Sequence, residues 1–173
     1  MRNIRLNARF VEHMPVSPDE FRAALSRFPS GVTVVTSRDA SGGRNGITVS
    51  AFSSVSLDPP LVLVCIEKSV ASHRALHGSK AFVVNILAQG QDRISQHFAL
   101  PAPVEFEGLR WTSGIEDTPV LEDALVSLEC RLRDAHDGGD HTIFVGEVEA
   151  VTIRDGSPLI YFHGNYRDLL DTD

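Results

Sequence analysis

The sequence has few of the residues and segments that would indicate a membrane, secreted or nucleic-acid-binding protein. It contains only two cysteines, and no stretch approaches the roughly 20 apolar residues that a membrane-spanning helix needs. Residues 1–15 contain scattered arginines but no apolar core of signal-peptide length. The 16 lysines and arginines are outnumbered by 23 aspartates and glutamates, so the net charge is -7 and does not favour a phosphate backbone. We therefore expect a cytoplasmic protein that binds neither membranes nor nucleic acid.

Several common site motifs are also absent. The sequence has no G-x-G-x-x-G, no Walker loop and no G-x-S-x-G, which are fingerprints of dinucleotide, triphosphate and hydrolase sites. His73 and His77 have the spacing of a metal pair, but no Glu completes an H-E-x-x-H motif and no third ligand is evident, so no metal is expected. Cys65 and Cys130 lie in apolar runs, which favours reduced, buried thiols over a disulfide.

The 173 residues suffice for one domain with a real hydrophobic core. Short β-branched or alternating runs recur along the chain, and no β-α alternation is present, which favours a mainly β, antiparallel barrel. The run at 61–66 is apolar throughout, as in a strand buried on both faces. The expected strands are 32–37, 48–56, 61–66, 81–87, 128–133, 142–153 (Gly146 marking a bulge or a close backbone approach) and 158–163, with a turn at 134–139.

Few helices are expected. Ser17-Pro18-Asp19-Glu20 combines an N-cap Ser, a Pro at the first helical position and a Glu three residues after the cap. The following apolar residues, Phe21, Ala24, Leu25 and Phe28, share one helix face, so this helix is expected to plug a sheet or barrel. Two further short helices are expected at 69–78 and 91–99, and Phe106 and Trp111 should anchor the irregular segment 100–114. Residues 1–16 are interpreted as a tail or arm, and 17–170 as the domain.

The stretch from Asn45 to Pro60 carries more hydroxyls than a strand needs. If residues 48–56 are extended, Thr48, Ser50, Ser54 and Ser56 surround Phe52 on one face, while Val49, Ala51, Ser53 and Val55 form the other. The hydroxyl face could hold a flat ligand with polar edges. It could also be the solvated face of a strand that follows an Asn45-Gly46 hairpin turn.

Three other segments have both a functional and an ordinary structural interpretation. The hydroxyls that begin the helix at 69–78 lie near Lys68, His73 and Arg74, either as a phosphate site or as an ordinary capped surface helix. Gly139-Asp140-His141 places an imidazole at a turn, either oriented for a site by the neighbouring carboxylate or simply as a solvent-exposed turn histidine. The polar cluster at 163–167 could close over a nucleotide or be an exposed turn.

The ordered motifs resemble those of the flavin reductase family, whose members are the small reductase components of two-component flavin-dependent monooxygenases. These motifs occur in the same order as in the family and cover about residues 17–169. They are GITVSAFSSVSLDPPLVLVCI at 46–66, FVVNIL at 82–87, QHFA at 96–99, GDH at 139–141 and PLIY at 158–161. The resemblance implies an FMN-binding split barrel, that is, an antiparallel Greek-key split β-barrel with a few flanking helices. It also implies a homodimer with hydride transfer from NADH or NADPH to FMN or FAD, and delivery of reduced flavin to a partner monooxygenase.

The family's functional residues carry over by position. No side chain is expected to be essential for chemistry, because the hydride passes between stacked rings, with His141 in a supporting role. The residues implied for flavin are Asn45, Gly46, Thr48, Val49, Ser50, Ala51, Ser53, Ser54, Cys65, Ile66, Lys68, Ser69, Ser72 and His73, and those for NAD(P)H are Asp140, His141, Tyr166 and Arg167. His73 stands where the family has Thr or a similar residue, and Glu67 adds negative charge near the expected phosphate.

Two other functions are compatible with this fold. One is a non-catalytic flavin-binding electron carrier or sensor. The other is an enzyme like pyridoxamine-phosphate oxidase, which would need a conspicuous basic phosphate site that the few clustered lysines and arginines do not provide.

Overall fold

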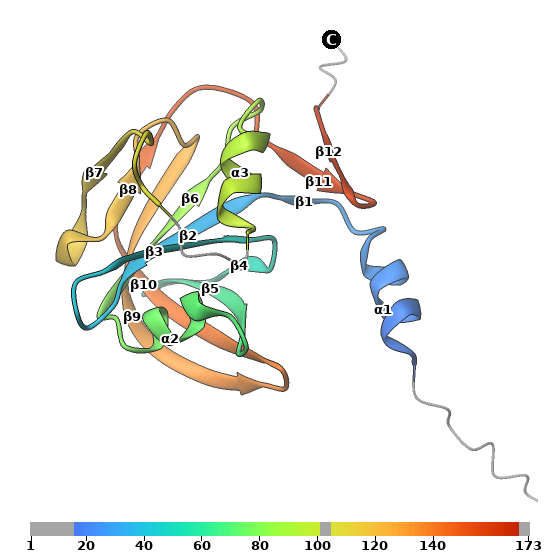
Figure 1. Cartoon of the computed structure of the whole chain (residues 1–173), viewed down its shortest axis with the longest axis horizontal. Helices are drawn as coiled ribbons and strands as arrows, with labels where there is room; N and C mark the ends of the chain where they lie inside the picture. The colour runs from blue at the N-terminus through green and yellow to red at the C-terminus, as the bar shows by residue number, and fades with distance from the viewer. Residues whose placement is uncertain (1–15, 101–104, 170–173) are drawn as a thin grey trace, which may run out of the picture.

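The structure is a computed structural model that describes residues 16–100 and 105–169. Its main element is one antiparallel sheet of seven strands in the order β3-β2-β6-β9-β10-β5-β4 (Figure 1). The strands are β2 (Thr33–Arg38), β3 (Arg44–Val49), β4 (Phe52–Leu57), β5 (Pro60–Glu67), β6 (Ala81–Ile86), β9 (Val126–Gly138) and β10 (His141–Ile153). The expectation of a mainly β, antiparallel split barrel is confirmed.

The sheet is rolled because its two edge strands are neighbours in the chain. β3 ends at Val49 and β4 begins at Phe52, so Ser50 and Ala51 alone carry the chain from one edge of the sheet to the other. The N–H of Cys65 in β5 donates to the carbonyl of Ala51 at 3.0 Å. The expectation of one continuous strand over 48–56 is therefore wrong, and Val55, which was placed on the apolar face, is 50% exposed. The alternation of side chains between two faces does not continue across Ser50-Ala51, because the chain leaves one edge of the sheet there and joins the other.

The turn before β3 also differs from the expectation. Asn45 and Gly46 do not form a hairpin turn but pair within the ladder with Ser37 and Thr36. The turn lies at 39–43, where Asp39 accepts hydrogen bonds from the backbone N–H groups of Ser41 and Gly43. The turn is therefore held by the carboxylate of Asp39 and not by an Asn-Gly pair.

The barrel interior is a close-packed apolar core. Val64, Phe82, Val84 and Phe144 are completely buried in it. On β5 only alternate residues (Val62, Val64 and Ile66) are buried, so the expectation that 61–66 is buried on both faces is wrong. Its other face, including the half-buried Cys65, is only partly covered, and this thiol is free but not buried as expected.

A buried polar side chain ties three segments together inside the barrel wall. The Asn85 amide donates to the carbonyl of Val34 at 3.1 Å and to the hydroxyl of Thr36 at 3.3 Å. Its carbonyl oxygen accepts from the N–H of Leu121 and the hydroxyl of Ser127. Asn85 has no exposed surface, so these four bonds offset the cost of burying an amide.

The β9–β10 hairpin is longer than predicted. The turn expected at 134–139 is only Gly139-Asp140, because Gly138 already pairs with His141. Register shifts occur at Val145/Gly146 and at Val148/Ala150. A Cβ on Gly146 would lie 2.4 Å from Phe82 Cζ, which confirms the predicted close approach of the backbone. The hairpin tip is the lower end of the barrel in Figure 1.

Smaller elements cover the ends of the barrel. β1 (Ser30–Gly31), β11 (Ile160–Phe162) and β12 (Asn165–Arg167) form a small sheet, and β7 (Trp111–Ser113) pairs with β8 (Pro119–Leu121). The strand expected at 158–163 is thus shorter and is followed by a second one. The helices are α1 (Pro18–Leu25), α2 (Ala71–His77), α3 (Asp92–Phe98) and the 3-10 turn η1 (Ile115–Asp117). Phe98, Phe106 and Trp111 pack in one apolar cluster, as expected.

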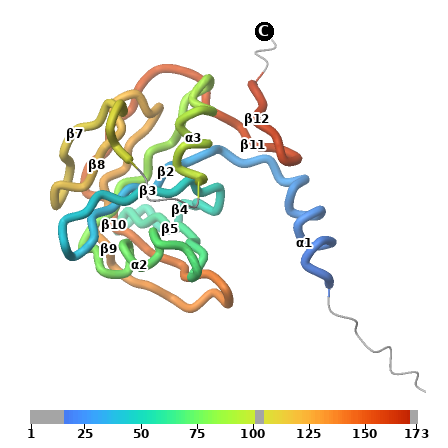
Figure 2. Tube along the Cα trace, viewed as in Figure 1, coloured from blue at the N-terminus to red at the C-terminus, as the bar shows by residue number. Residues whose placement is uncertain are grey.

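Helix α1 begins as predicted but does not plug the barrel. Ser17 accepts from the N–H of Glu20, and Glu20 accepts from the N–H of Ser17, which completes the capping box. No residue of α1 is buried, and Phe21 and Leu25 are 58% and 57% exposed. Figure 2 shows the helix leading away from the barrel, with only its C-terminal end near β11 and β12. The expectation of a plug is therefore wrong, because helical spacing shows that an apolar face exists but not what covers it.

The predicted tail at 1–16 lies almost entirely outside the described residues, and the domain bounds 17–170 remain a prediction. Within residues 16–100 and 105–169, no helix is long and apolar enough to cross a membrane.

Candidate functional site

The β3–β4 crossing at Ser50-Ala51 lines three of four adjoining hollows. The one that collects most of the predicted flavin residues, here called the central hollow, has a volume of about 220 Å³. It is lined by residues 47–51 and 65–67, by Val70 and by His141. Ser50 and Ala51 are small and exposed, so a ligand can approach the backbone where the chain changes sheet edges.

The other three hollows share residues with the central one or with each other. The α2–α3 hollow, of about 470 Å³, shares Ile47 and Val70 with it. The tyrosine hollow, of about 170 Å³, shares Thr48 and Ser50. The apolar groove, of about 350 Å³, shares Ser50, Ala51 and Cys65. Their remaining lining residues are Gly46, Ser69, Ala71, Ser72, Arg74 and 98–100 in the first, Val32, Ser95, Ala99, Tyr161 and Tyr166 in the second, and Leu25, Phe28, Ser30, Phe52, Ser53 and Leu63 in the third.

Most of the predicted flavin residues lie in these hollows. The structure brings together Thr48, Val49, Ser50, Ala51, Cys65, Ile66 and His141 in the central hollow, Gly46, Ser69 and Ser72 in the α2–α3 hollow, Ser53 in the apolar groove and Tyr166 in the tyrosine hollow. His141 thus comes from the far end of the sequence to the same hollow as the β3–β4 crossing.

Six predicted residues line none of these four hollows: Asn45, Ser54, Lys68, His73, Asp140 and Arg167. The Asn45 amide donates to Asp39 and to the carbonyl of Gly43, which holds the β2–β3 turn. Ser54 and Arg167 are exposed on their strands. Asp140 lies beside the central hollow through its contact with His141.

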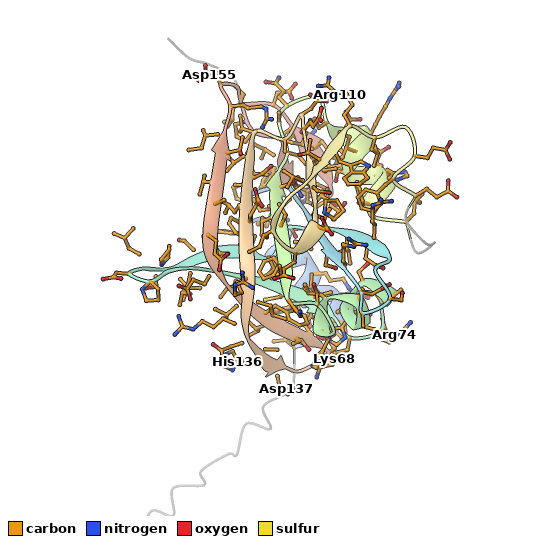
Figure 3. All side chains as sticks on the ribbon, turned by 90° about the vertical axis from the view of Figure 1, so that its left-hand side faces the viewer. Lys68, Arg74, Arg110, His136, Asp137 and Asp155 are labelled. Atoms are coloured by element: carbon orange, nitrogen blue, oxygen red, sulfur yellow. The ribbon has the colours of Figure 1, made fainter. Side chains whose placement is uncertain are left out.

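Lys68 directly follows β5 and contacts the tip of the β9–β10 hairpin. Its ammonium pairs with Asp137 and donates to the carbonyl of Gly139, and its N–H donates to the carbonyl of Asp140 at 2.9 Å. Figure 3 shows Lys68 and Asp137 together at one end of the barrel, with Arg74 on the neighbouring helix. The ammonium lowers the pKa of the Asp137 carboxyl through this hydrogen bond and its charge. Lys68 therefore fixes the turn from which His141 projects.

The start of α2 is not capped as its sequence suggested. Val70 is the N-cap residue, and no side chain caps the helix. The Ser69 hydroxyl donates to Glu67, and the Ser72 hydroxyl donates to the carbonyl of Gly46 at 3.2 Å. Both serines still line the α2–α3 hollow, and of the three basic candidates near them only Arg74 does so.

His73 points into the barrel wall. Its Nε2 lies 2.8 Å from the hydroxyl of Thr142, and its ring lies 5.5 Å from that of Phe144. Burial lowers the pKa of His73, and the neighbouring charges of His77, Lys68 and Arg74 lower it further. A neutral imidazole at this position holds α2 against β10 and offers little attraction to a phosphate.

His141 is held by its neighbour. Its Nδ1 lies 2.7 Å from Asp140 Oδ1, and 41% of its side chain is exposed. This hydrogen bond to His141 lowers the pKa of the Asp140 carboxyl. The carboxylate fixes the ring orientation, and among residues 16–100 and 105–169 no partner occupies Nε2.

The thiol of Cys65 also lines the central hollow. Burial raises the pKa of this thiol, so it remains protonated at neutral pH and is a poor nucleophile. Burial, and then the charge of Glu129, raises the pKa of Cys130 to about 12. Among residues 16–100 and 105–169, no group of three His, Cys, Asp or Glu side chains could hold a metal ion.

Sequence reasoning missed several lining residues. Phe98 and Tyr161 lie within motifs that carry the family resemblance, but nothing in their spacing marks them as part of a site. Leu25 and Phe28 were assigned to a structural helix, yet they form one wall of the apolar groove. Their contribution depends on how separate segments meet, which no local pattern encodes.

Comparison with known proteins gives a consistent result. The family model described as "Flavin reductase like domain" matches residues 25–170. The chain is 44% identical over 146 residues to an FMN reductase (NADH) of Agrobacterium fabrum, covering 84% of this chain and 83% of the relative. It is 41% identical over 153 residues to the reductase component of 4-hydroxyphenylacetate 3-monooxygenase from Thermus thermophilus, covering 88% of this chain and 97% of the relative.

A solved structure agrees over almost its whole length. The NADH:FAD oxidoreductase of Streptomyces globisporus, in complex with NAD and FAD fragments, superposes with a TM-score of 0.85 at 36% identity, covering 92% of this chain and 99% of that one. A relative from Rhizobium meliloti is longer. The chain matches it with 38% identity over 149 residues, which is 86% of this chain but only 48% of the relative.

Proposed function

Because the chain belongs to the flavin reductase family, we propose that it transfers a hydride from NADH to FMN or FAD and supplies the reduced flavin to a separate monooxygenase. The observation that carries this proposal is the central hollow, which joins the β3–β4 crossing to His141. One hollow with small hydroxyl residues on one side and an oriented imidazole on the other suits two stacked rings.

The residues of the hollows fit a flavin. Ser50 and Ala51 leave room beside the backbone, and the hydroxyls and N–H groups along 46–54 can meet the polar edge of the ring. We place the flavin ring along the central hollow and its phosphate toward Ser69, Ser72 and Arg74 in the α2–α3 hollow. Bound flavin supplies the hydride acceptor, and the protein supplies position and polarity.

His141 is placed on the nicotinamide side. Its ring is oriented by Asp140, and its turn is fixed by Lys68, so the free Nε2 can donate to or accept from a carboxamide. The relatives from Agrobacterium fabrum and Streptomyces globisporus are named as NADH enzymes, which supports NADH over NADPH. Lys68 and His73 act in this proposal through the elements they hold, while Asn45, Ser54 and Arg167 stay peripheral.

We also propose that the chain forms a homodimer. α1 has eight residues and no buried side chain, and an isolated helix of fewer than about 12 residues is marginal in water. Leu57 on the edge strand β4 is 92% exposed and Phe28 is 78% exposed. A second copy that covers these residues would bury an apolar surface beside the apolar groove. The two free cysteines accord with a cytoplasmic location.

The test of function is NADH oxidation by the purified protein, without flavin and then with FMN, FAD or riboflavin. Oxidation that depends on added flavin is the expected result. Oxidation in no condition, with flavin bound and retained through dilution, would support the carrier or sensor function instead.

A matched pair of variants tests the position of the site. Ala51→Leu fills the central hollow at an exposed position and should abolish flavin-dependent oxidation. Ala40→Leu adds the same atoms to the exposed β2–β3 turn and should leave oxidation unchanged. Equal activity of the two variants would show that flavin binds elsewhere.

A further inference from the structure

Ser95 connects two walls of the site through a buried polar contact. It lies in the middle of α3 and has no exposed surface. Its carbonyl accepts a hydrogen bond from the Thr48 hydroxyl at 2.6 Å, and its own hydroxyl accepts one from the Tyr166 hydroxyl at 2.8 Å. One residue therefore links β3, the strand that begins the proposed flavin-binding segment at 46–54, to β12 near the end of the chain.

The two partners of Ser95 face the same space. Thr48 and Tyr166 both line the tyrosine hollow, together with Ser50 from the central hollow. Tyr161 continues that wall, because its ring packs edge-on against Tyr166 at 5.6 Å. The hydrogen bond from Tyr166 thus holds an aromatic wall opposite the hydroxyls of the β3–β4 crossing.

A serine at this position needs an explanation, because alanine fits a helix interior better and buries no hydroxyl. Within the described parts of the chain, Tyr166 is the hydrogen-bond partner of the Ser95 hydroxyl. A buried hydroxyl is costly unless it is paired. The hydrogen bond between Ser95 and Tyr166 offsets that cost and fixes the position of Tyr166.

Helix α3 fixes β3 at a second point. One turn after Ser95, the Phe98 ring lies against Gly46, where a Cβ would be only 2.4 Å from Phe98 Cε1. The helix therefore contacts the flavin segment through Phe98 and through the Thr48 bond, and it contacts the C-terminal hairpin through Ser95. Because α3 lies between β3 and the C-terminal hairpin, it sets the distance between them.

We propose that Ser95 is a positioning residue that holds Tyr166 as a wall of the flavin site. This inference rests on the proposed flavin reductase function and reassigns Tyr166, which was expected to contact the nicotinamide. Tyr166 shares a hollow with Thr48 and Ser50 but not with His141. The pair therefore affects flavin affinity, and the nicotinamide is bound on the other side by His141.

The test compares Ser95→Ala, Tyr166→Phe and the double variant in steady-state NADH oxidation. Each single change removes the same hydrogen bond and should raise the KM for flavin about 3- to 10-fold, the value of one ordinary hydrogen bond. The double variant should show no further rise, because the bond is already lost. The KM for NADH and the kcat should stay within about twofold of the wild type.

Ser127→Ala is the matched control. Ser127 is also a buried serine whose hydroxyl has one side-chain partner, Asn85, but it lies away from the four hollows. It should lower the Tm about as much as Ser95→Ala does and leave the KM for flavin unchanged. The same rise in flavin KM in both variants would mean that Ser95 acts only on stability.

The inference can fail independently of the proposed function. An unchanged flavin KM in Ser95→Ala, or effects of the two single variants that multiply in the double variant, would overturn it while the wild type still oxidises NADH. If the wild type does not oxidise NADH, the proposed function fails. Titration of FMN fluorescence with wild type and Ser95→Ala then decides the inference, which requires a weaker Kd for the variant.

Discussion

At the scale of single residues, the site depends on side chains whose partners come from distant parts of the chain. His141 is oriented by Asp140 beside it, but its turn is held by Lys68, about 70 positions earlier. His73 has a different role: it packs against Thr142 and Phe144 in the barrel wall, where burial lowers its pKa. Residue identity alone did not separate these two histidines.

Replacing His141 by Ala should raise the KM for NADH more than the KM for flavin. Loss of an oriented hydrogen-bonding ring predicts an increase of about 5- to 30-fold for NADH, with the flavin KM within about twofold. Steady-state kinetics with each substrate varied in turn measures both values. His136→Ala changes an exposed histidine of the same hairpin and should have no effect. An unchanged NADH dependence in His141→Ala contradicts the assignment.

The lowered pKa of His73 makes stability depend on pH. Folding favours the neutral form of His73, so its contribution to the free energy of unfolding is complete above the pKa of the unfolded state, about 6.5. This contribution is lost as pH falls from that value through the lower pKa of the folded state. Between about pH 8 and pH 5, the Tm of the wild type should therefore fall more than that of His73→Gln. Thermal unfolding monitored by circular dichroism measures the difference. His136→Gln is the control, and parallel Tm curves for wild type and His73→Gln would refute the prediction.

At the scale of elements, α3 supports β3, the strand that begins the proposed flavin-binding residues 46–54. β3 contacts this helix through Gly46 against Phe98 and through Thr48 bonded to Ser95. The helix was expected from its sequence, and its Ile94 and Phe98 pack in the apolar cluster. Its role in the site could not be expected, because local spacing defines a helix face without naming the strand that it meets.

Gly46→Ala should destabilise the fold because the new methyl group collides with the Phe98 ring. Overpacking of this kind costs about 1–3 kcal/mol in the free energy of unfolding, measured by urea denaturation. The double variant Gly46→Ala/Phe98→Leu should recover part of the loss, since the smaller side chain makes room. Gly78→Ala, whose Cβ would be 3.7 Å from its nearest neighbour, is the control and should cost less. A Gly46→Ala protein as stable as the control would show that Phe98 moves freely.

At the scale of the whole molecule, the rolled sheet leaves apolar groups exposed beside the site. α1, the edge strand β4 and the apolar groove adjoin one another through Leu25, Phe28 and Phe52. Ser50 and Ala51 connect the two edge strands of the rolled sheet, and they line three of the four hollows. The connection that closes the sheet therefore also carries the proposed binding surface.

The proposed homodimer predicts that the wild-type mass in light scattering is twice that of the 18.9 kDa chain. Phe28→Ser and Leu57→Ser remove exposed apolar groups and should shift the protein toward the monomer. Ile153→Ser, at the far end of β10 and 75% exposed, is the control and should leave the mass unchanged. A monomeric wild type, or variants that remain dimeric, would contradict the proposed interface.

The sequence by itself determined the fold class, the capping box of α1, the two later helices, the close approach at Gly146 and most residues of the central hollow. These features depend on local patterns, or on motifs that a family preserves in order. Only the tertiary structure decided that 48–56 is two strands, that α1 stands away from the barrel, and that Lys68 and His73 turn away from the hollows while Ser95, Phe98 and Tyr161 help to form them. The physical reason is that sheet closure and side-chain partners are long-range: which strand edges meet, and which hydroxyl finds which acceptor, is settled only when the whole barrel packs.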